Sequence, residues 1–204
     1  NRVEWRAAPN LVDYRAACTG FSWDAARVAL DGLPGGAGLN IAHEAVDRHC
    51  RDSGGDRVAL RWLDREGRTH RYTYAWLRER SDRFANVLRG LGIGKGDLVC
   101  TLLGRVPELY IAALGAWKNR SPFCALFSAF GPEPIRVRLA MGRARVLVTT
   151  PALYQRKVAA LRAVLPDLEH VLLVRVLQSC GDLRDDSRCS GHVDGPDTAD
   201  HAHQ

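Results

Sequence analysis

The sequence lacks the features that direct a protein into or across a membrane. Its longest apolar run, Leu109–Trp117, is far shorter than the roughly 20 residues that a transmembrane helix needs. No charged segment followed by an apolar one opens the chain, which is the pattern of a secretory leader. Together the two absences predict a cytoplasmic protein that makes no contact with a membrane.

Paired cysteines are also missing. The six cysteines are scattered, with no CxxC pair and no regular spacing, so they predict reduced thiols rather than a disulfide framework. Cys100 and Cys124 stand in apolar runs, where cysteine behaves as a small hydrophobic residue. The cysteines and histidines near the end of the chain match no zinc-finger or zinc-ribbon spacing, so we predict no metal site.

A basic block with interleaved aromatic residues is absent as well. The net charge of +6 and the pI of about 9.2 would suit an anionic partner. However, the arginines alternate with acids, as in residues 78–83, which is typical of a solvated helix face. We therefore predict no nucleic-acid binding.

The chain contains no Ser/Thr/Gly-rich loop with a lysine, the segment that would hold the triphosphate of ATP. Two glycine-rich segments could be mistaken for one. Residues 32–38 are not followed by Lys-Ser or Lys-Thr, and residues 92–97 end a helix and open a strand, which is the reverse of a phosphate cradle. We interpret the first as a connector and the second as a turn.

The first third of the chain predicts helices and a hairpin. Apolar residues at helical spacing indicate two short helices between residues 9 and 30, and Asn40 is a suitable N-cap for a helix over 41–49. Residues 57–63 and 68–73 alternate polar and apolar side chains around a turn, which indicates a β-hairpin. Thr73 is then expected to cap a long amphipathic helix.

From residue 98 onward the pattern is regular. Predicted apolar strands alternate with predicted helices, in the order strand 98–103, helix 107–118, strand 123–127, helix 132–141, strand 145–149, helix 152–165 and strand 170–174. This alternation predicts βαβ units and a mostly parallel, buried sheet, and hence an α/β fold. The expected domains are a helical extension with its linker (1–38), a partial α/β domain (39–174) and a disordered tail (175–204), which has few large apolar residues.

Two segments carry a family resemblance. Residues 105–118, RVPELYIAALGAWK, and 127–134, FSAFGPEP, resemble the early part of AMP-forming acetyl-CoA synthetases, in the adenylate-forming superfamily. The likeness runs from about Asn1 to Val174. It implies a ligase that converts a carboxylate such as acetate, with ATP and CoA, to acyl-CoA, AMP and pyrophosphate.

The resemblance also implies that the phosphate loop and the catalytic lysine lie beyond residue 204. We therefore interpret the chain as an amino-terminal fragment without catalytic residues of its own. ATP and Mg²⁺ would bind only in a full-length relative, and the isolated chain is expected to be inactive. The alternative is a non-catalytic protein, either a truncated relic or an interaction module that uses the helical amino end.

The resemblance further implies a weak CoA site. In the family, the segment matching 127–130 lies where the nucleotide of CoA docks, and basic residues in the segment matching 155–157 reach its phosphates. The candidate contacts are Phe127, Ser128, Ala129, Arg156 and Lys157. A solvated helix face is the other interpretation of Arg156 and Lys157.

One departure from the family pattern predicts strain. The helix ending at Lys118 is usually followed by one residue and then Gly-Ala, whereas this chain has Arg120-Ser121. A glycine just past a helix end normally adopts a left-handed conformation, in which a side chain costs about 1–2 kcal/mol. We therefore expect Arg120 to be held in that conformation.

Overall fold

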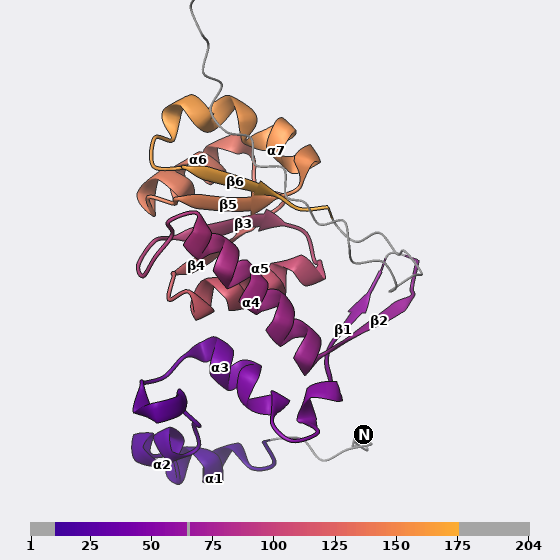
Figure 1. Cartoon of the computed structure of the whole chain (residues 1–204), viewed down its shortest axis with the longest axis vertical. Helices are drawn as coiled ribbons and strands as arrows, with labels where there is room; N and C mark the ends of the chain where they lie inside the picture. Colours follow the sequence, from indigo (N-terminus) through magenta and orange to yellow (C-terminus); the bar gives the residue numbers. More distant parts are fainter. Residues whose placement is uncertain (1–10, 65, 176–204) are drawn as a thin grey trace, which may run out of the picture.

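The chain folds as an α/β protein with a parallel sheet, as the sequence predicts (Figure 1). The computed structural model describes residues 11–64 and 66–175, so most of the predicted tail lies outside the described residues. The helices are α1 (Tyr14–Thr19), α2 (Trp23–Val28), α3 (Ile41–Ala45), α4 (Tyr74–Gly90), α5 (Pro107–Lys118), α6 (Pro132–Met141) and α7 (Pro151–Lys157). The strands are β1 (Val58–Leu63), β2 (Thr69–Thr73), β3 (Val99–Leu103), β4 (Phe123–Phe127), β5 (Val146–Thr149) and β6 (His170–Leu173).

Strands β3 to β6 form one parallel sheet in the order β4-β3-β5-β6. The connection through α5 runs to one side of β3, and the connections through α6 and α7 run to the other side. Right-handed crossovers therefore place α5 on one face of the sheet and α6 and α7 on the opposite face. Figure 1 shows α6 and α7 above the sheet and α4 and α5 below it.

The core has two layers that follow the alternation along β3. Val99 and Leu103 pack with α4 and α5, while Cys100 and Leu102 pack with residues of α6 and of the segment after α7. Because both faces of β3 are covered, all of its residues are buried. Gly115 lets α4 lie close to α5, since a β-carbon there would be 2.9 Å from the carbonyl oxygen of Ser81.

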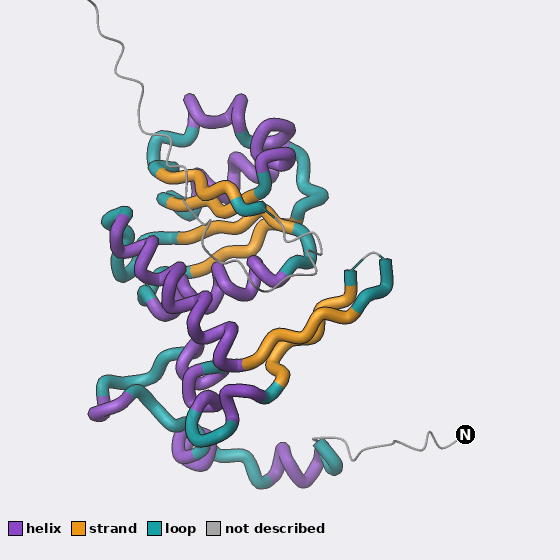
Figure 2. The backbone as a smooth tube through the Cα atoms, turned by 45° about the vertical axis from the view of Figure 1, so that its right-hand side comes forward, coloured by secondary structure: helices purple, strands orange, loops and turns teal. Residues whose placement is uncertain are grey.

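The amino-terminal helices lie below this domain and contribute no buried side chain. The chain after them is held by Glu44, whose carboxylate accepts hydrogen bonds from the backbone N–H groups of Asp31 (3.1 Å) and Gly32 (2.7 Å). Asn40 caps α3 as predicted, and its amide donates to the carbonyl of Trp117 (2.9 Å). The β1–β2 hairpin extends away from the rest of the molecule (Figure 2).

Two predicted helices proved shorter than expected. The helix over 41–49 ends at Ala45, and the helix over 152–165 ends at Lys157; a 3₁₀ helix follows in each case (Asp47–Cys50 and Ala159–Val164). Both breaks fall at a buried valine with a non-helical φ, −132° at Val46 and −123° at Val158. Valine has a slightly lower helix propensity than unbranched residues, and each of these two valines is fixed in a core cluster at the point where the chain leaves the α-helix.

No helix within residues 11–64 and 66–175 is long and apolar enough to cross a membrane.

Two buried threonines on neighbouring strands provide a test of the core. Thr101 on β3 is fully buried, and its hydroxyl has no hydrogen-bond partner among the described residues. Thr149 on β5 is equally buried, but its hydroxyl donates to the carbonyl of Leu102 at 2.8 Å. A buried hydroxyl without a partner costs free energy, whereas a bonded one contributes to stability.

We predict that Thr101→Val raises the free energy of unfolding by about 1 kcal/mol, because valine has the same shape without the hydroxyl. The matched variant Thr149→Val should lower it by about 1 kcal/mol, because a hydrogen bond is lost. Urea denaturation of both variants measures the two changes. A decrease for both variants would contradict the assignment of Thr101 as unpaired.

Candidate functional site

The candidate site lies at the carboxyl edge of the parallel sheet, where ligands bind in open α/β folds. β4 ends at Phe127, and the chain then makes a turn closed by a hydrogen bond from the Phe130 N–H to the Phe127 carbonyl (3.0 Å). The two phenylalanine rings meet edge to face, with centroids 5.6 Å apart. Phe127 is 62% exposed, so one ring is presented at the surface.

The structure brings Lys157 to this turn. Lys157 is the last residue of α7, and its Nζ donates hydrogen bonds to the carbonyl oxygens of Ser128 (2.6 Å) and Phe130 (2.7 Å). The side chain is half-buried. Lys157 therefore fixes the shape of the turn, since its ammonium group is held by two backbone carbonyls.

Arg156 has a different environment. It is exposed, and its side chain has no hydrogen-bond or ion-pair partner in the part of the chain that the structure describes. Ala129, at the tip of the turn, is exposed as well. A solvated helix face thus describes Arg156 but not Lys157, and only Arg156 of the pair offers its charge to the surroundings.

Sequence reasoning missed Arg138. Its guanidinium lies over the ring of Phe130, 4.4 Å from the centroid, and its Nη1 donates to the carbonyl of Pro134 (3.1 Å). A cation over an aromatic face stabilises the ring in place. The sequence gives no signal for this contact, because α6 carries arginines at two positions and the orientation of the helix over the turn is a tertiary feature.

The acid nearest in sequence to the turn is neutralised locally. Glu133, in the first turn of α6, forms a bidentate pair with Arg136 (2.6 and 2.8 Å). This pairing holds the pKa of the Glu133 carboxyl below its usual range, so the group stays ionised and paired. The surroundings of the turn are therefore not acidic overall.

The turn at 127–130 and its neighbouring side chains can bind a ligand but supply no group that would react with it. An exposed aromatic ring and a free arginine beside a fixed turn suit a flat ring and an anion at a surface site. Within residues 11–64 and 66–175 no group of three or more His, Cys, Asp or Glu side chains could hold a metal ion. Two surface concavities of the described residues, one around Arg143 and Arg145 and one around Arg89 and Arg120, include no residue of this turn.

We predict that Lys157→Met lowers the free energy of unfolding by about 1–3 kcal/mol and loosens the turn, because two half-buried carbonyls lose a charged donor. Arg156→Met is the matched control and should change stability by less than about 0.5 kcal/mol, because Arg156 is exposed and unpaired among the described residues. Thermal unfolding gives the first quantity, and amide hydrogen exchange over 127–131 gives the second. Equal effects of the two substitutions would show that Lys157 does not hold the turn.

Comparisons with known proteins identify the family. The model of a family described as AMP-binding enzyme matches residues 46–201. The family likeness therefore extends past Val174, the end expected from the sequence. The acetyl-coenzyme A synthetase of Bacillus subtilis (strain 168) is 38% identical over 166 residues, which is 81% of this chain and 28% of that protein. That of Streptomyces coelicolor is 34% identical over 145 residues, 67% of this chain and 22% of that protein.

Solved structures agree. The Brucella canis acyl-CoA synthetase superposes with a TM-score of 0.69 and 33% identity, over 82% of this chain and 29% of that one. The anthranilate CoA ligase AuaEII, solved with anthranoyl-AMP, shares the fold with a TM-score of 0.59 and 22% identity, over 67% of this chain and 25% of that one. The chain thus spans less than a third of the relatives it matches.

Since the family model covers most of the chain and the fold agrees with a solved acyl-CoA synthetase, the chain belongs to the AMP-binding enzyme family, as an amino-terminal part of an adenylate-forming enzyme.

Proposed function

We propose that the chain is the amino-terminal part of an AMP-forming acetate–CoA ligase, which converts a carboxylate, ATP and CoA to acyl-CoA, AMP and pyrophosphate. The observation that carries this proposal is the 38% identity to a protein named acetyl-coenzyme A synthetase over 81% of the chain. The identity of the acyl substrate as acetate rests on the names of such relatives.

In this proposal the chain contributes a surface for the nucleotide end of CoA. Phe127 presents its exposed ring at the carboxyl edge, where an adenine can stack. Arg156 provides a free guanidinium for a phosphate, because no described residue pairs with it. Lys157 acts indirectly, because its ammonium is already bonded to the Ser128 and Phe130 carbonyls and so shapes the turn.

ATP and Mg²⁺ would be held by the rest of a longer enzyme. The glycine-rich segment 92–97 is a structural turn between α4 and β3, in which the Asp97 carboxylate accepts a hydrogen bond from the Gly94 N–H (2.8 Å). The 204 residues contain no Ser/Thr/Gly-rich loop with a lysine. Positioned charges provide most of the catalysis in phosphoryl and adenylyl chemistry, so the isolated chain should be inactive.

The alternative function, a non-catalytic interaction module, is favoured by one observation. Helices α1 and α2 bury none of their own side chains, and Tyr14 and Trp23 are 73% and 74% exposed. Exposed aromatic residues are common at protein interfaces. This alternative predicts a protein partner but no affinity for CoA, so CoA binding separates the two functions.

We predict that the isolated chain binds CoA weakly and that the affinity falls as salt is raised, because an exposed charge is screened. Arg156→Ala should weaken binding about tenfold, the loss expected for one charge-assisted hydrogen bond. Calorimetric titration with CoA and with dephospho-CoA, which has one phosphate fewer, measures the contribution of the phosphates. Arg162→Ala is not suitable as a control, because the Arg162 guanidinium binds the Leu168 carbonyl. Arg71→Ala is the matched control, because it removes an equal charge from strand β2, outside the 127–130 turn and α7. If the wild type does not bind CoA, the proposed site is wrong.

We also predict that acetate-dependent exchange of pyrophosphate into ATP by the isolated chain stays at background, because the 204 residues contain no Ser/Thr/Gly-rich loop with a lysine to position the triphosphate. A full-length relative assayed alongside shows that the assay detects exchange. Turnover above background by the 204-residue chain would contradict the proposal that the ATP site lies elsewhere.

A further inference from the structure

A second surface feature lies at the opposite edge of the sheet. A concavity of about 300 Å³ opens where α4 and α5 end, next to the turn at residues 92–97. This turn leads into the amino end of β3, whereas the 127–130 turn follows the carboxyl end of β4. Because β3 and β4 are parallel, the concavity and the proposed CoA surface lie at opposite edges.

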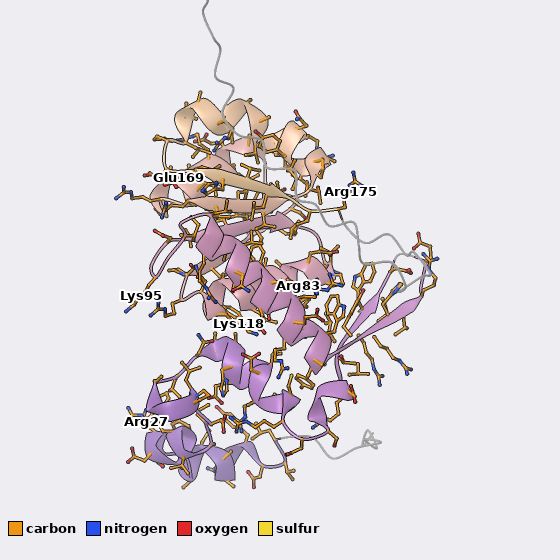
Figure 3. All side chains as sticks on the ribbon, in the orientation of Figure 1. Arg27, Arg83, Lys95, Lys118, Glu169 and Arg175 are labelled. Carbon is orange, nitrogen blue, oxygen red and sulfur yellow. The ribbon has the colours of Figure 1, made fainter. Side chains whose placement is uncertain are left out.

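Positive charge dominates this concavity. Its lining residues include Arg89, Lys95, Lys118 and Arg120 and no acidic residue. Lys118 is neutralised, because its Nζ bonds to the carboxylates of Asp47 and Asp82, both at 2.7 Å. Figure 3 shows Lys118 between α4 and the helices below it, and Lys95 pointing outward at the edge of the molecule.

The other three cations are unpaired. Arg89, Lys95 and Arg120 are exposed, and the side chain of none of them has a hydrogen-bond or ion-pair partner within residues 11–64 and 66–175. Three neighbouring like charges around one hollow repel each other, so an anion in the hollow would relieve the repulsion.

The backbone conformation of Arg120 is a second feature of this concavity. Its φ is +63°, the left-handed region that the sequence predicts for this position and that favours glycine. Arg143 after α6 has the same feature, with φ of +48°, but its guanidinium pairs with Asp167 (3.2 Å). Arg120 has the strain without such a pair among the described residues, and strained residues concentrate at binding sites.

The backbone around Arg120 is fixed. The Arg120 carbonyl accepts a hydrogen bond from the Gly96 N–H (3.2 Å). The carbonyls of Ile93 and Gly94 accept from the Asn119 amide (2.8 Å) and the Ser121 hydroxyl (3.0 Å). These carbonyls are therefore occupied within the protein, and the turn that carries Lys95 is held against the end of α5.

Helix dipoles do not account for this set of charges. Cations near helix C-termini are stabilising, which explains Arg89 in the last turn of α4 and Lys118 in the last turn of α5. Arg120 lies beyond the end of α5, where a glycine would close the helix without strain. Its side chain therefore needs a reason other than capping.

We propose that the concavity formed by Arg89, Lys95 and Arg120 binds a small phosphate-bearing anion with at least two negative charges. Two guanidinium groups can each donate a pair of hydrogen bonds to phosphate oxygens, and the ammonium group of Lys95 adds a mobile point charge. The site is separate from the proposed CoA surface and does not depend on the proposed function.

The test compares the thermal unfolding of the full chain in inorganic pyrophosphate and in sodium chloride of equal ionic strength. With pyrophosphate at roughly 100 times its Kd, the wild-type Tm should rise by about 5 °C or more, because the anion binds only the folded chain. Arg120→Gly should remove this rise, and without the anion its Tm should exceed that of the wild type by about 2 °C, because the strain is relieved.

Arg143→Gly is the matched control, because it relieves the same kind of strain at a residue that does not line the concavity. Its response to pyrophosphate should equal that of the wild type. Arg89→Ala should weaken pyrophosphate binding about tenfold in a calorimetric titration. The proposal would be wrong if pyrophosphate had no specific effect on the wild type. It would also be wrong if the effect were undiminished in Arg120→Gly or lost equally in Arg143→Gly. Arg156→Ala should keep the wild-type response to pyrophosphate, because Arg156 does not line the concavity, and this separates the site from the proposed CoA surface.

Discussion

The burial of β3 on both faces is the constraint on which the fold depends. All residues from Val99 to Leu103 are buried, so helices must cover both sides of the sheet. The sheet order β4-β3-β5-β6 and right-handed crossovers then determine which helix covers which side. As a consequence, the strand ends are the exposed parts of the sheet. The carboxyl edge carries the turn at 127–130, and the amino edge carries the turn at 92–97.

Ion pairs fix the amino edge and join it to the helices. Arg145, at the start of β5, bonds to Asp97 (2.6 Å) in the turn before β3 and to Glu169 (2.6 Å) before β6. Lys118, whose side chain is only 8% exposed, joins α5 to Asp82 on α4 and to Asp47 after α3. A partly desolvated charge needs its partners, so these contacts constrain the relative positions of several elements. The amino edge is therefore a rigid frame.

Much of the fold could be predicted from the sequence, because local signals and burial agree. The bounds of α5, β4 and α6 were correct, since proline starts each helix and the apolar strand is continuous. The left-handed Arg120 was also predicted, from a missing glycine. The breaks at Val46 and Val158 were not, because they depend on where each valine is buried. The role of Lys157 in holding the turn could not be predicted either, since its acceptors are backbone carbonyls 27 and 29 residues away.

The charge of a basic residue can be used inside the protein or offered to a ligand, and composition does not distinguish these uses. Lys157 and Lys118 direct their ammonium groups inward, to carbonyls and carboxylates, and stabilise the structure. Arg156 and Arg120 are exposed, and their side chains have no partner in the described chain. Lys157 and Arg156 are neighbours in sequence, and Lys118 and Arg120 lie at the end of α5. The helix that carries the bonded lysine therefore also positions the unpaired arginine. Rigid support by one cation beside a free cation is the arrangement that both proposed anion sites share.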